Sequence, residues 1–277
     1  MKRKTLLLVM LLAFLSAHAQ MASLYLLDEM KDGKEIDKVN YEIVYQLQEM
    51  FDTLKNQHFK ELMLLQIGDS ASAFFSYPRY QSDSLVLAMK KKGETNIQVN
   101  INSNVSWKLY KGYPAGKSRY LDNVSQNYVC EEPIEVPKWQ LVADSLDTIA
   151  GYPCRLATAF YKGRLWRAWY AEDVPIDNGP WKLQGLPGLI LKASDSQQQY
   201  VFTAVGLHHA GQQPLLYPGS KCEPISRRNL AKLYARFNAD NIGFLIEANK
   251  GMKITFTDDK GNTLKHSRPI PYNEIER

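Results

Sequence analysis

The feature that most constrains the fold is a pair of apolar segments, residues 152–161 and 164–171, which are separated only by the dipeptide Lys162-Gly163. A two-residue loop containing glycine is typical of a β-hairpin, because the tight turn requires positive φ. Pairing about this loop places Ala159 opposite Trp166 on one face. The other face also carries large apolar side chains. We therefore expect a central antiparallel hairpin that is covered on both faces.

Short apolar segments of this kind recur along the chain, with turn residues between them. We expect strands at residues 41–47, 62–67, 96–110, 118–129, 139–146, 189–193, 200–205, 252–257 and 263–266. Helices are expected at residues 82–90 and after Ser226, where Leu230 and Leu233 share one face. Few helices and no strand–helix–strand alternation indicate a mainly antiparallel sheet.

We predict that the mature chain, residues 20–277, is a single domain of mainly β or α+β class. Its expected architecture is a curved antiparallel sheet with a few short helices. A half-barrel like that of periplasmic lipoprotein carriers is one form of such a sheet. Residues 185–190, Gly-Leu-Pro-Gly-Leu-Ile, are expected to form a type II turn that leads into a strand. Pro187 restricts φ to about −65°, and Gly188 accepts positive φ.

The N-terminus has the pattern of a cleavable secretory signal peptide over residues 1–19. Three basic residues, at positions 2–4, precede the apolar run 5–14, and Ala-His-Ala at 17–19 provides small residues for cleavage. The apolar run is too short to span a bilayer, and no second long apolar run follows. We therefore expect an exported protein that is periplasmic, associated with the outer membrane or extracellular, with no transmembrane segment in the mature chain.

Charge and cysteine content exclude several classes of function. The formal net charge is +5, and removing the three charges of the signal peptide (5 − 3) leaves about +2. That balance is too weak to indicate nucleic-acid binding. Cys130, Cys154 and Cys222 are widely spaced, unlike the ligands of a zinc site or a redox pair. An odd number of cysteines leaves at least one thiol without a partner. Two alternatives therefore stay open: one disulfide with one free thiol, or three buried free thiols.

Residues 179–191, Gly-Pro-Trp-Lys-Leu-Gln-Gly-Leu-Pro-Gly-Leu-Ile-Leu, closely resemble the signature of the GLPGLI family. The marked residues of this motif are Gly179, Pro180, Gly185, Leu186, Pro187, Gly188, Leu189 and Ile190. The resemblance covers about residues 40–277, although Leu183 stands where an aromatic residue is usual and Glu274 where proline is usual. Proteins of this family are exported by one Gram-negative lineage and have no assigned reaction. The resemblance therefore implies export, and turn and core chemistry rather than acid–base catalysis.

One motif suggests an enzyme. Gly68-Asp69-Ser70 follows the apolar run 62–67, like the nucleophile block of GDS-type esterases. Such an enzyme also needs an Asp-x-x-His pair. The residues three before His58, His208, His209 and His266 are Lys55, Val205, Gly206 and Thr263, so no triad can be assembled from that signature. A turn is the better interpretation of the tripeptide.

Two other patterns are weaker. His208 and His209 are adjacent and would point to opposite faces of a strand, which does not suit a metal site. Glu131 and Glu132 could act as paired carboxylates on a glycoside, but Pro133 follows directly, and a solvated pair at a strand end is the simpler interpretation. We therefore predict no catalytic residue, no metal and no cofactor.

Aromatic side chains form the remaining candidate site. Trp166 faces small alanines across the hairpin, so we expect its indole to be exposed and to bind a ligand. Arg164 and Tyr170 share that strand face and could hold a polar or anionic end of the ligand. Trp169 lies on the opposite face, where a core position is expected. The alternative is that all of these side chains belong to the core.

Two functions stay open. The favoured one is a non-enzymatic binding or envelope-accessory protein, in which an apolar surface takes a lipid, a peptide or an envelope protein. The alternative is a secreted hydrolase of unrecognised type that uses Ser70. Replacing Ser70 by alanine distinguishes them, because the change would abolish the hydrolase and leave the binding protein intact.

Overall fold

A computed structural model of the chain describes residues 33–94, 102–249, 255–258 and 260–277. The predicted signal peptide and parts of the predicted strands 96–110 and 252–257 lie outside the described residues. The strands are β1 (Lys34–Lys38), β2 (Tyr41–Asp52), β3 (Gln57–Ile67), β4 (Ser72–Ser76), β5 (Lys108–Lys111), β6 (Lys117–Asn123), β7 (Asn127–Pro133), β8 (Gln140–Ile149), β9 (Tyr152–Tyr161), β10 (Arg164–Ala171), β11 (Leu189–Asp195), β12 (Tyr200–His209), β13 (Pro214–Tyr217), β14 (Glu223–Pro224), β15 (Phe256–Thr257) and β16 (Thr263–Leu264). The helices are α1 (Tyr77–Lys91), α2 (Arg227–Ala239) and α3 (Asn241–Ala248).

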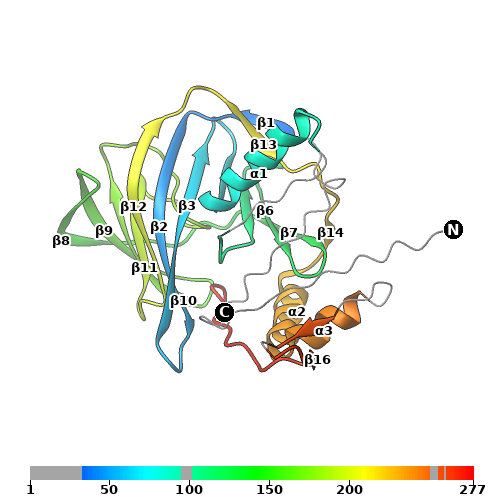
Figure 1. Cartoon of the computed structure of the whole chain (residues 1–277). Coiled ribbons are helices and arrows are strands. Elements are labelled where there is room, and N and C mark those ends of the chain that lie inside the picture. The colour runs from blue at the N-terminus through cyan, green and yellow to red at the C-terminus, as the bar shows by residue number, and fades with distance from the viewer. Residues whose placement is uncertain (1–32, 95–101, 250–254, 259) are drawn as a thin grey trace.

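Twelve of these strands form one curved sheet in the order β14-β7-β6-β5-β4-β3-β2-β12-β11-β10-β9-β8 (Figure 1). Strands β2 to β7 form one antiparallel meander, β8 to β12 form a second, and the pairing of β12 with β2 joins the two. Within the described sheet, only the short β14–β7 contact is parallel. The sheet remains open, because β14 and β8 each have a single neighbour. The predicted curved, mainly antiparallel sheet with a few short helices is confirmed.

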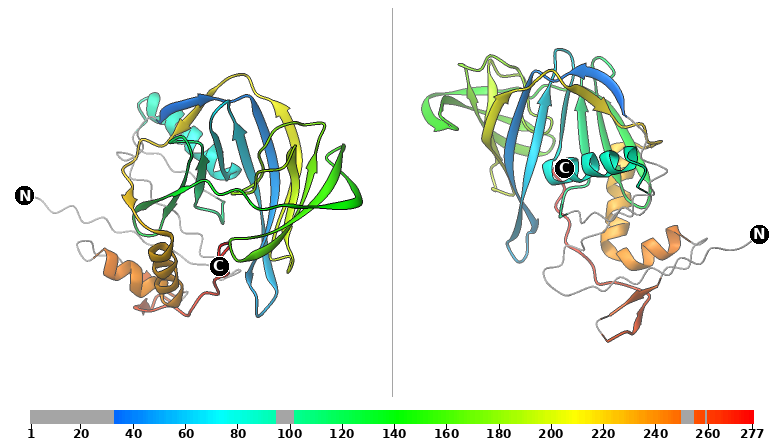
Figure 2. Two further views of the ribbon diagram at one scale, coloured as in Figure 1. Left: turned by 180° about the vertical axis from the view of Figure 1, so that it is seen from behind. Right: turned by 45° about the horizontal axis from the view of Figure 1, so that its top comes forward.

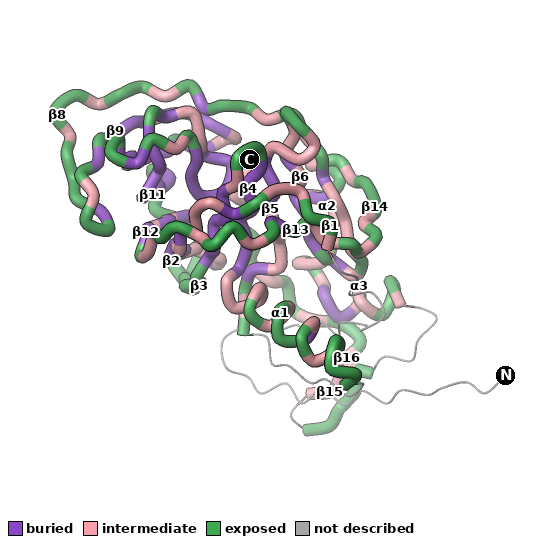
Figure 3. The backbone as a smooth tube through the Cα atoms, turned by 90° about the horizontal axis from the view of Figure 1, so that it is seen from above, coloured by how far each residue is buried: buried purple, intermediate pink, exposed green. Residues whose placement is uncertain are grey.

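The inner face of the curve carries the larger hydrophobic core. Tyr45, Phe74 and Phe202 are fully buried there, on three different strands. The segment between β10 and β11, residues 172–188, completes this core together with α2, whose Leu230 is also buried. Figure 3 shows the C-terminal end inside the curve, surrounded by strands. Segments distant in sequence therefore fill the inner face.

A second, smaller core lies on the outer face of β3 to β7. Leu64, Phe75 and Leu121 are buried in it together with Leu215 of β13. The two-stranded ribbon of β1 and β13 and the helix α1 lie over this part of the sheet (Figure 2). The outer face of the other limb, β8 to β12, has no helix over it in the part of the chain that the structure describes.

Local sequence signals place several elements correctly. The β9–β10 turn has φ of +49° at Lys162 and +77° at Gly163, and Ala159 pairs with Trp166 as predicted. Ser226 caps α2 as predicted. The expected start of the first helix is wrong. Helix α1 begins at Tyr77, where the hydroxyl of Ser76 accepts a hydrogen bond from the N–H of Arg79 at 3.3 Å.

None of the described helices has the length and apolar character needed to span a bilayer.

Candidate functional site

The predicted binding residues are buried in the inner core. Trp166, Tyr170 and Arg164 are 0%, 1% and 3% exposed. The ring of Trp181 lies 5.4 Å from that of Trp166, centroid to centroid, and the indole N–H of Trp166 donates to the carbonyl of Tyr161 at 3.2 Å. The expectation that Trp166 is exposed is therefore wrong. Small alanines do lie opposite it, but the segment that follows β10 covers the remaining space.

Arg164 holds a segment of its own chain. Its Nη1 donates to Oδ2 of Asp195 at 2.8 Å. Its Nε donates to the carbonyl of Ile275 at 2.9 Å, and its Nη2 donates to Oδ1 of Asn273 at 2.9 Å. These last partners belong to residues 273–277, which we call the C-terminal strap. These partners all lie within the molecule, and the role of Arg164 and Tyr170 in holding a polar or anionic end of a ligand stays a prediction.

The C-terminal strap joins strands from both meanders. The side-chain amide of Asn273 donates to the carbonyl of Met50 at 2.8 Å, and the hydroxyl of Tyr200 donates to the carbonyl of Asn273 at 2.5 Å. At the other end, the N–H of Arg277 donates to the carbonyl of Lys162 at 3.0 Å. The strap therefore lies across the inner face between β2, β12 and the β9–β10 turn.

The hexapeptide at residues 185–190 packs closely against the end of β10. Gly188 does not have the left-handed φ that a type II turn needs, so that prediction is wrong. A Cβ at Gly188 would lie 2.1 Å from the carbonyl oxygen of Ala171, so glycine is required by the close approach of the end of β10. Left-handed φ values occur instead at Trp181 (+52°) and Gly185 (+92°).

The rest of the motif is mostly buried. Leu186, Leu189 and Ile190 are almost completely inaccessible, whereas Pro187 is exposed. A Cβ at Gly179 would lie 2.8 Å from Cβ of Ile190, and Pro180 beside it is buried. Through these contacts the motif packs against the inner core together with Trp181.

Exposed apolar side chains occur near the free edge of the sheet, on both of its faces. Leu141 and Leu146 of β8 are 64% and 71% exposed, Phe160 of β9 is 74% exposed, and Leu165 of β10 is 46% exposed. Phe160 and Leu165 are direct cross-strand partners on the face opposite Trp166. Leu141 and Leu146 lie opposite Ala157 and Arg155 and therefore share the face of Trp166. We call Leu141 and Leu146, with the unpaired side of β8, the apolar edge. A free strand bordered by apolar side chains can pair with another chain.

Ser70 lies in a turn that Asp37 stabilises. The N–H and the hydroxyl of Ser70 both donate to Oδ2 of Asp37, at 2.7 and 3.0 Å. The adjacent Asp69 accepts a hydrogen bond from Asn40 at 2.7 Å. Among the described residues, no histidine is hydrogen-bonded to Ser70. The geometry matches the turn interpretation, and it does not assemble a Ser–His–Asp triad.

His208 and His209, the adjacent histidines considered as a metal site, contact different residues. His208 lies 3.1 Å from Oε2 of Glu42, whereas the ring of His209 packs against Tyr41. The described residues contain no group of three or more side chains arranged to hold a metal ion. Cys130 and Cys154 are buried free thiols, and Cys222 is partly buried and also free.

Glu131 and Glu132 point to opposite sides of β7. Glu131 forms an ion pair with Arg119 at 2.8 Å, and Glu132 forms one with Lys182 at 2.6 Å. The expectation of a solvated pair is therefore wrong for Glu132, whose side chain is only 23% exposed. The inward carboxylate belongs to a group of charged side chains that no local sequence signal brings together.

Comparisons with known proteins give limited information. A family model described as a protein of unknown function (Porph_ging) matches residues 160–192, from the β9–β10 turn through the hexapeptide. No curated protein matches the chain. Two structures of PNGF-II are similar: one in space group C2 is 13% identical with a TM-score of 0.47, covering 70% of this chain and 32% of that chain. The other, in space group P21, is 14% identical with a TM-score of 0.46, covering 70% and 33%. This chain thus spans about a third of the length of PNGF-II.

Proposed function

We propose that this chain is a non-enzymatic binding protein of the bacterial envelope, and that its protein partner docks on the apolar edge. The observation that supports the proposal is that β8, which pairs with β9 on one side only, carries two exposed apolar side chains on one face, Leu141 and Leu146. Edge strands of this kind accept an extended segment of another chain through main-chain hydrogen bonds, while neighbouring side chains provide specificity.

The geometry limits the form of such a complex. A bulge between Val142 and Leu146 interrupts β8, and Asp144 within it has φ of +57°. Bulges of this type shorten the pairing surface and guard against unselective aggregation. We therefore propose a partner segment of a few residues that pairs with β8 and lies beside Leu141 or Leu146. The inner face is an inferior candidate, because the C-terminal strap and Trp181 already fill it.

The proposal includes export through residues 1–19. It rests on the signal-like N-terminus and on the resemblance of residues 179–191 to the exported GLPGLI family. Mass spectrometry of the product tests this part separately. We expect a mature chain that begins near Gln20 in the envelope fraction, and an intact Met1 in the cytoplasmic fraction would contradict the proposal.

Photo-crosslinking in the cell tests the docking surface directly. A photoreactive phenylalanine analogue placed at Leu146 should give a discrete adduct with a partner protein. The same analogue at Leu54, which is 94% exposed in the β2–β3 turn, is the matched control and should give none. Leu141→Asp should abolish the adduct formed at position 146. Adducts of equal yield at position 54, or an adduct that is insensitive to Leu141→Asp, would overturn the proposal.

A further inference from the structure

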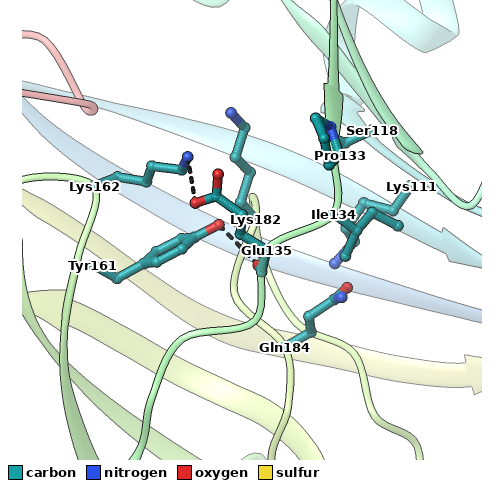
Figure 4. A pocket seen from close by; sticks show the side chains of 9 residues that line it. All are labelled: Lys111, Ser118, Pro133, Ile134, Glu135, Tyr161, Lys162, Lys182 and Gln184. Carbon is teal, nitrogen blue, oxygen red and sulfur yellow. Dashed lines mark hydrogen bonds and ion pairs between the residues drawn. The ribbon is translucent and has the colours of Figure 1, made fainter. Parts of the chain in front are cut away.

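A small pocket opens where five separate segments of the chain meet, away from the apolar edge. Its walls come from the end of β5, the start of β6, residues 133–135, the β9–β10 turn and residues 182–184 (Figure 4). The hollow is small and open to solvent: about 10 Å³ of it can hold the centre of a water-sized group, so one oxygen of a ligand fits inside it. Three of the residues that line it are lysines, Lys111, Lys162 and Lys182, and only one, Glu135, carries a carboxylate.

Two of these lysines already have carboxylate partners. Nζ of Lys162 lies 2.7 Å from Oε2 of Glu135. Nζ of Lys182 lies 2.6 Å from Oε2 of Glu132 and 2.8 Å from Oε1 of Glu276. These ion pairs balance the charge of two lysines within the protein.

The third lysine is buried without such a partner. Lys111 is 5% exposed, and its Nζ donates to Oδ1 of Asn178 at 2.6 Å and to the carbonyl of Gly179 at 3.2 Å. Both acceptors are neutral, and none of the described carboxylates lies within ion-pair distance of this Nζ. An ammonium group has three hydrogen-bond donors, so one remains available. Burying a charge without a counter-charge is unfavourable.

We propose that this pocket binds a small oxyanion, a carboxylate or phosphate group of a ligand, as the counter-ion of Lys111. Lys162 and Lys182 line the same hollow but are paired with carboxylates, so Lys111 is the lysine that lacks a counter-charge there. Lysine ammonium groups act as point charges toward such anions and impose no fixed planar geometry. The site therefore selects its ligand by charge and size, and it is independent of the apolar edge.

The anion should bind together with a proton. Burial lowers the pKa of Lys111 to about 7, although the charge of Asp177 opposes the shift. Above that pH the free protein has a neutral amine at this site, and an anion must restore the ammonium. Affinity should therefore fall by up to about tenfold for each pH unit above 7.

Sulfate and acetate are suitable probes, because neither changes charge between pH 6 and pH 9, and inorganic phosphate is compared with them at pH 6. Binding is measured by calorimetry at constant ionic strength, with chloride as the background ion. We expect binding at pH 6, progressive loss from pH 7.5 to pH 8.5, and uptake of a fraction of a proton per anion at pH 8. Preference for acetate would indicate a carboxylate ligand, and preference for phosphate a phosphorylated one.

Two lysine variants test where the anion binds. Lys111→Met should remove it, and Lys60→Met, which removes an exposed strand lysine, should leave it unchanged. Equal binding by Lys111→Met and the wild type would overturn the proposal, as would affinity that does not change between pH 6 and pH 9. If Lys111→Met fails to fold, the pH dependence of the wild type decides the matter alone.

Discussion

Single residues hold the inner core together in two ways. Glycine residues allow two stretches of backbone to approach closely, as Gly188 does at the carbonyl of Ala171. Buried polar side chains hold segments that are far apart in sequence, as Arg164 holds residues 273 and 275. Neither kind of contact has a local sequence signature. The Pro-Gly pair at 187–188 therefore predicted the wrong backbone geometry, although it marked an important position.

Gly188 provides the first test at this scale. Gly188→Ala should lower the free energy of unfolding by about 1–3 kcal/mol, because the new methyl group overlaps the Ala171 carbonyl. Gly206→Ala is the matched control, since a Cβ at that β12 position meets nothing within 4 Å. Urea denaturation should show no loss of stability in the control. Equal stability of both variants would contradict the packing that we assign to Gly188.

Asp122 provides a test that depends on pH. Burial raises its pKa to about 6, although hydrogen bonds from Ser106 and from the N–H of Asn123 oppose the shift. The hydroxyl of Tyr234 from α2 also donates to this carboxylate. The ordinary pKa of aspartate is about 3.9, so the folded protein holds the proton more tightly than the unfolded chain. The resulting contribution to stability is full below about pH 4 and is lost as the pH rises through about 6.

The expected size of this effect is about 3 kcal/mol, since one pKa unit corresponds to about 1.4 kcal/mol. Because part of the effect is already lost at pH 4, the free energy of unfolding of the wild type should fall by about 2 kcal/mol relative to Asp122→Asn between pH 4 and pH 6.5. Asp173→Asn, at an exposed position, should follow the wild type throughout. A constant difference between the wild type and Asp122→Asn across this range would show that the carboxyl titrates normally.

At the scale of elements, local patterns succeed where the contacts are local. The β9–β10 hairpin has its predicted register because its two strands and their turn form one continuous segment. Helix α2 begins where Ser226 can cap it. The start of α1 was missed, although Pro78 in its first turn is a sequence signal that could have revealed it. The strands β1 and β13 were missed because both are short, β1 is largely polar, and the two pair only with each other.

The β9–β10 turn offers a test of the C-terminal strap. Gly163 and Gly151 both end two-residue hairpin turns, with φ of +77° and +85°. A Cβ at Gly163 would lie 2.6 Å from the carbonyl oxygen of Arg277, whereas a Cβ at Gly151 meets nothing within 4 Å. Each change to alanine should cost about 1 kcal/mol through its backbone conformation.

Gly163→Ala should cost a further 1–3 kcal/mol, roughly, because it also displaces the strap. Differential scanning calorimetry of the two variants measures that difference. Removing Arg277 should make Gly163→Ala and Gly151→Ala equally stable relative to their parent chains. A difference that persists without Arg277 would show that the strap does not contact this turn.

At the scale of the whole molecule, the fold class could be predicted and the accessible surface could not. Repeated short apolar segments without intervening helices were sufficient for an open antiparallel sheet. The exposure of Trp166 depends on Trp181 and on packing that only the complete fold provides. For the same reason, Lys111, Lys162 and Lys182 lie far apart in the sequence and line one pocket only in three dimensions. Candidate sites on such a sheet must therefore be sought where its edges and connecting segments remain uncovered.

The central claim is that partners of this protein add to the free edge of the sheet and do not enter its inner face. Backbone amide hydrogen exchange, measured on the protein alone and on its crosslinked complex, tests this claim most directly. In the free protein, amides of β8 should exchange faster than those of β10, which has neighbours on both sides. In the complex, we predict new protection in β8 near Leu141 or Leu146, with β10 and residues 273–277 unchanged. Protection that appears in residues 273–277 or in the 172–188 segment, with β8 unaffected, would contradict the claim.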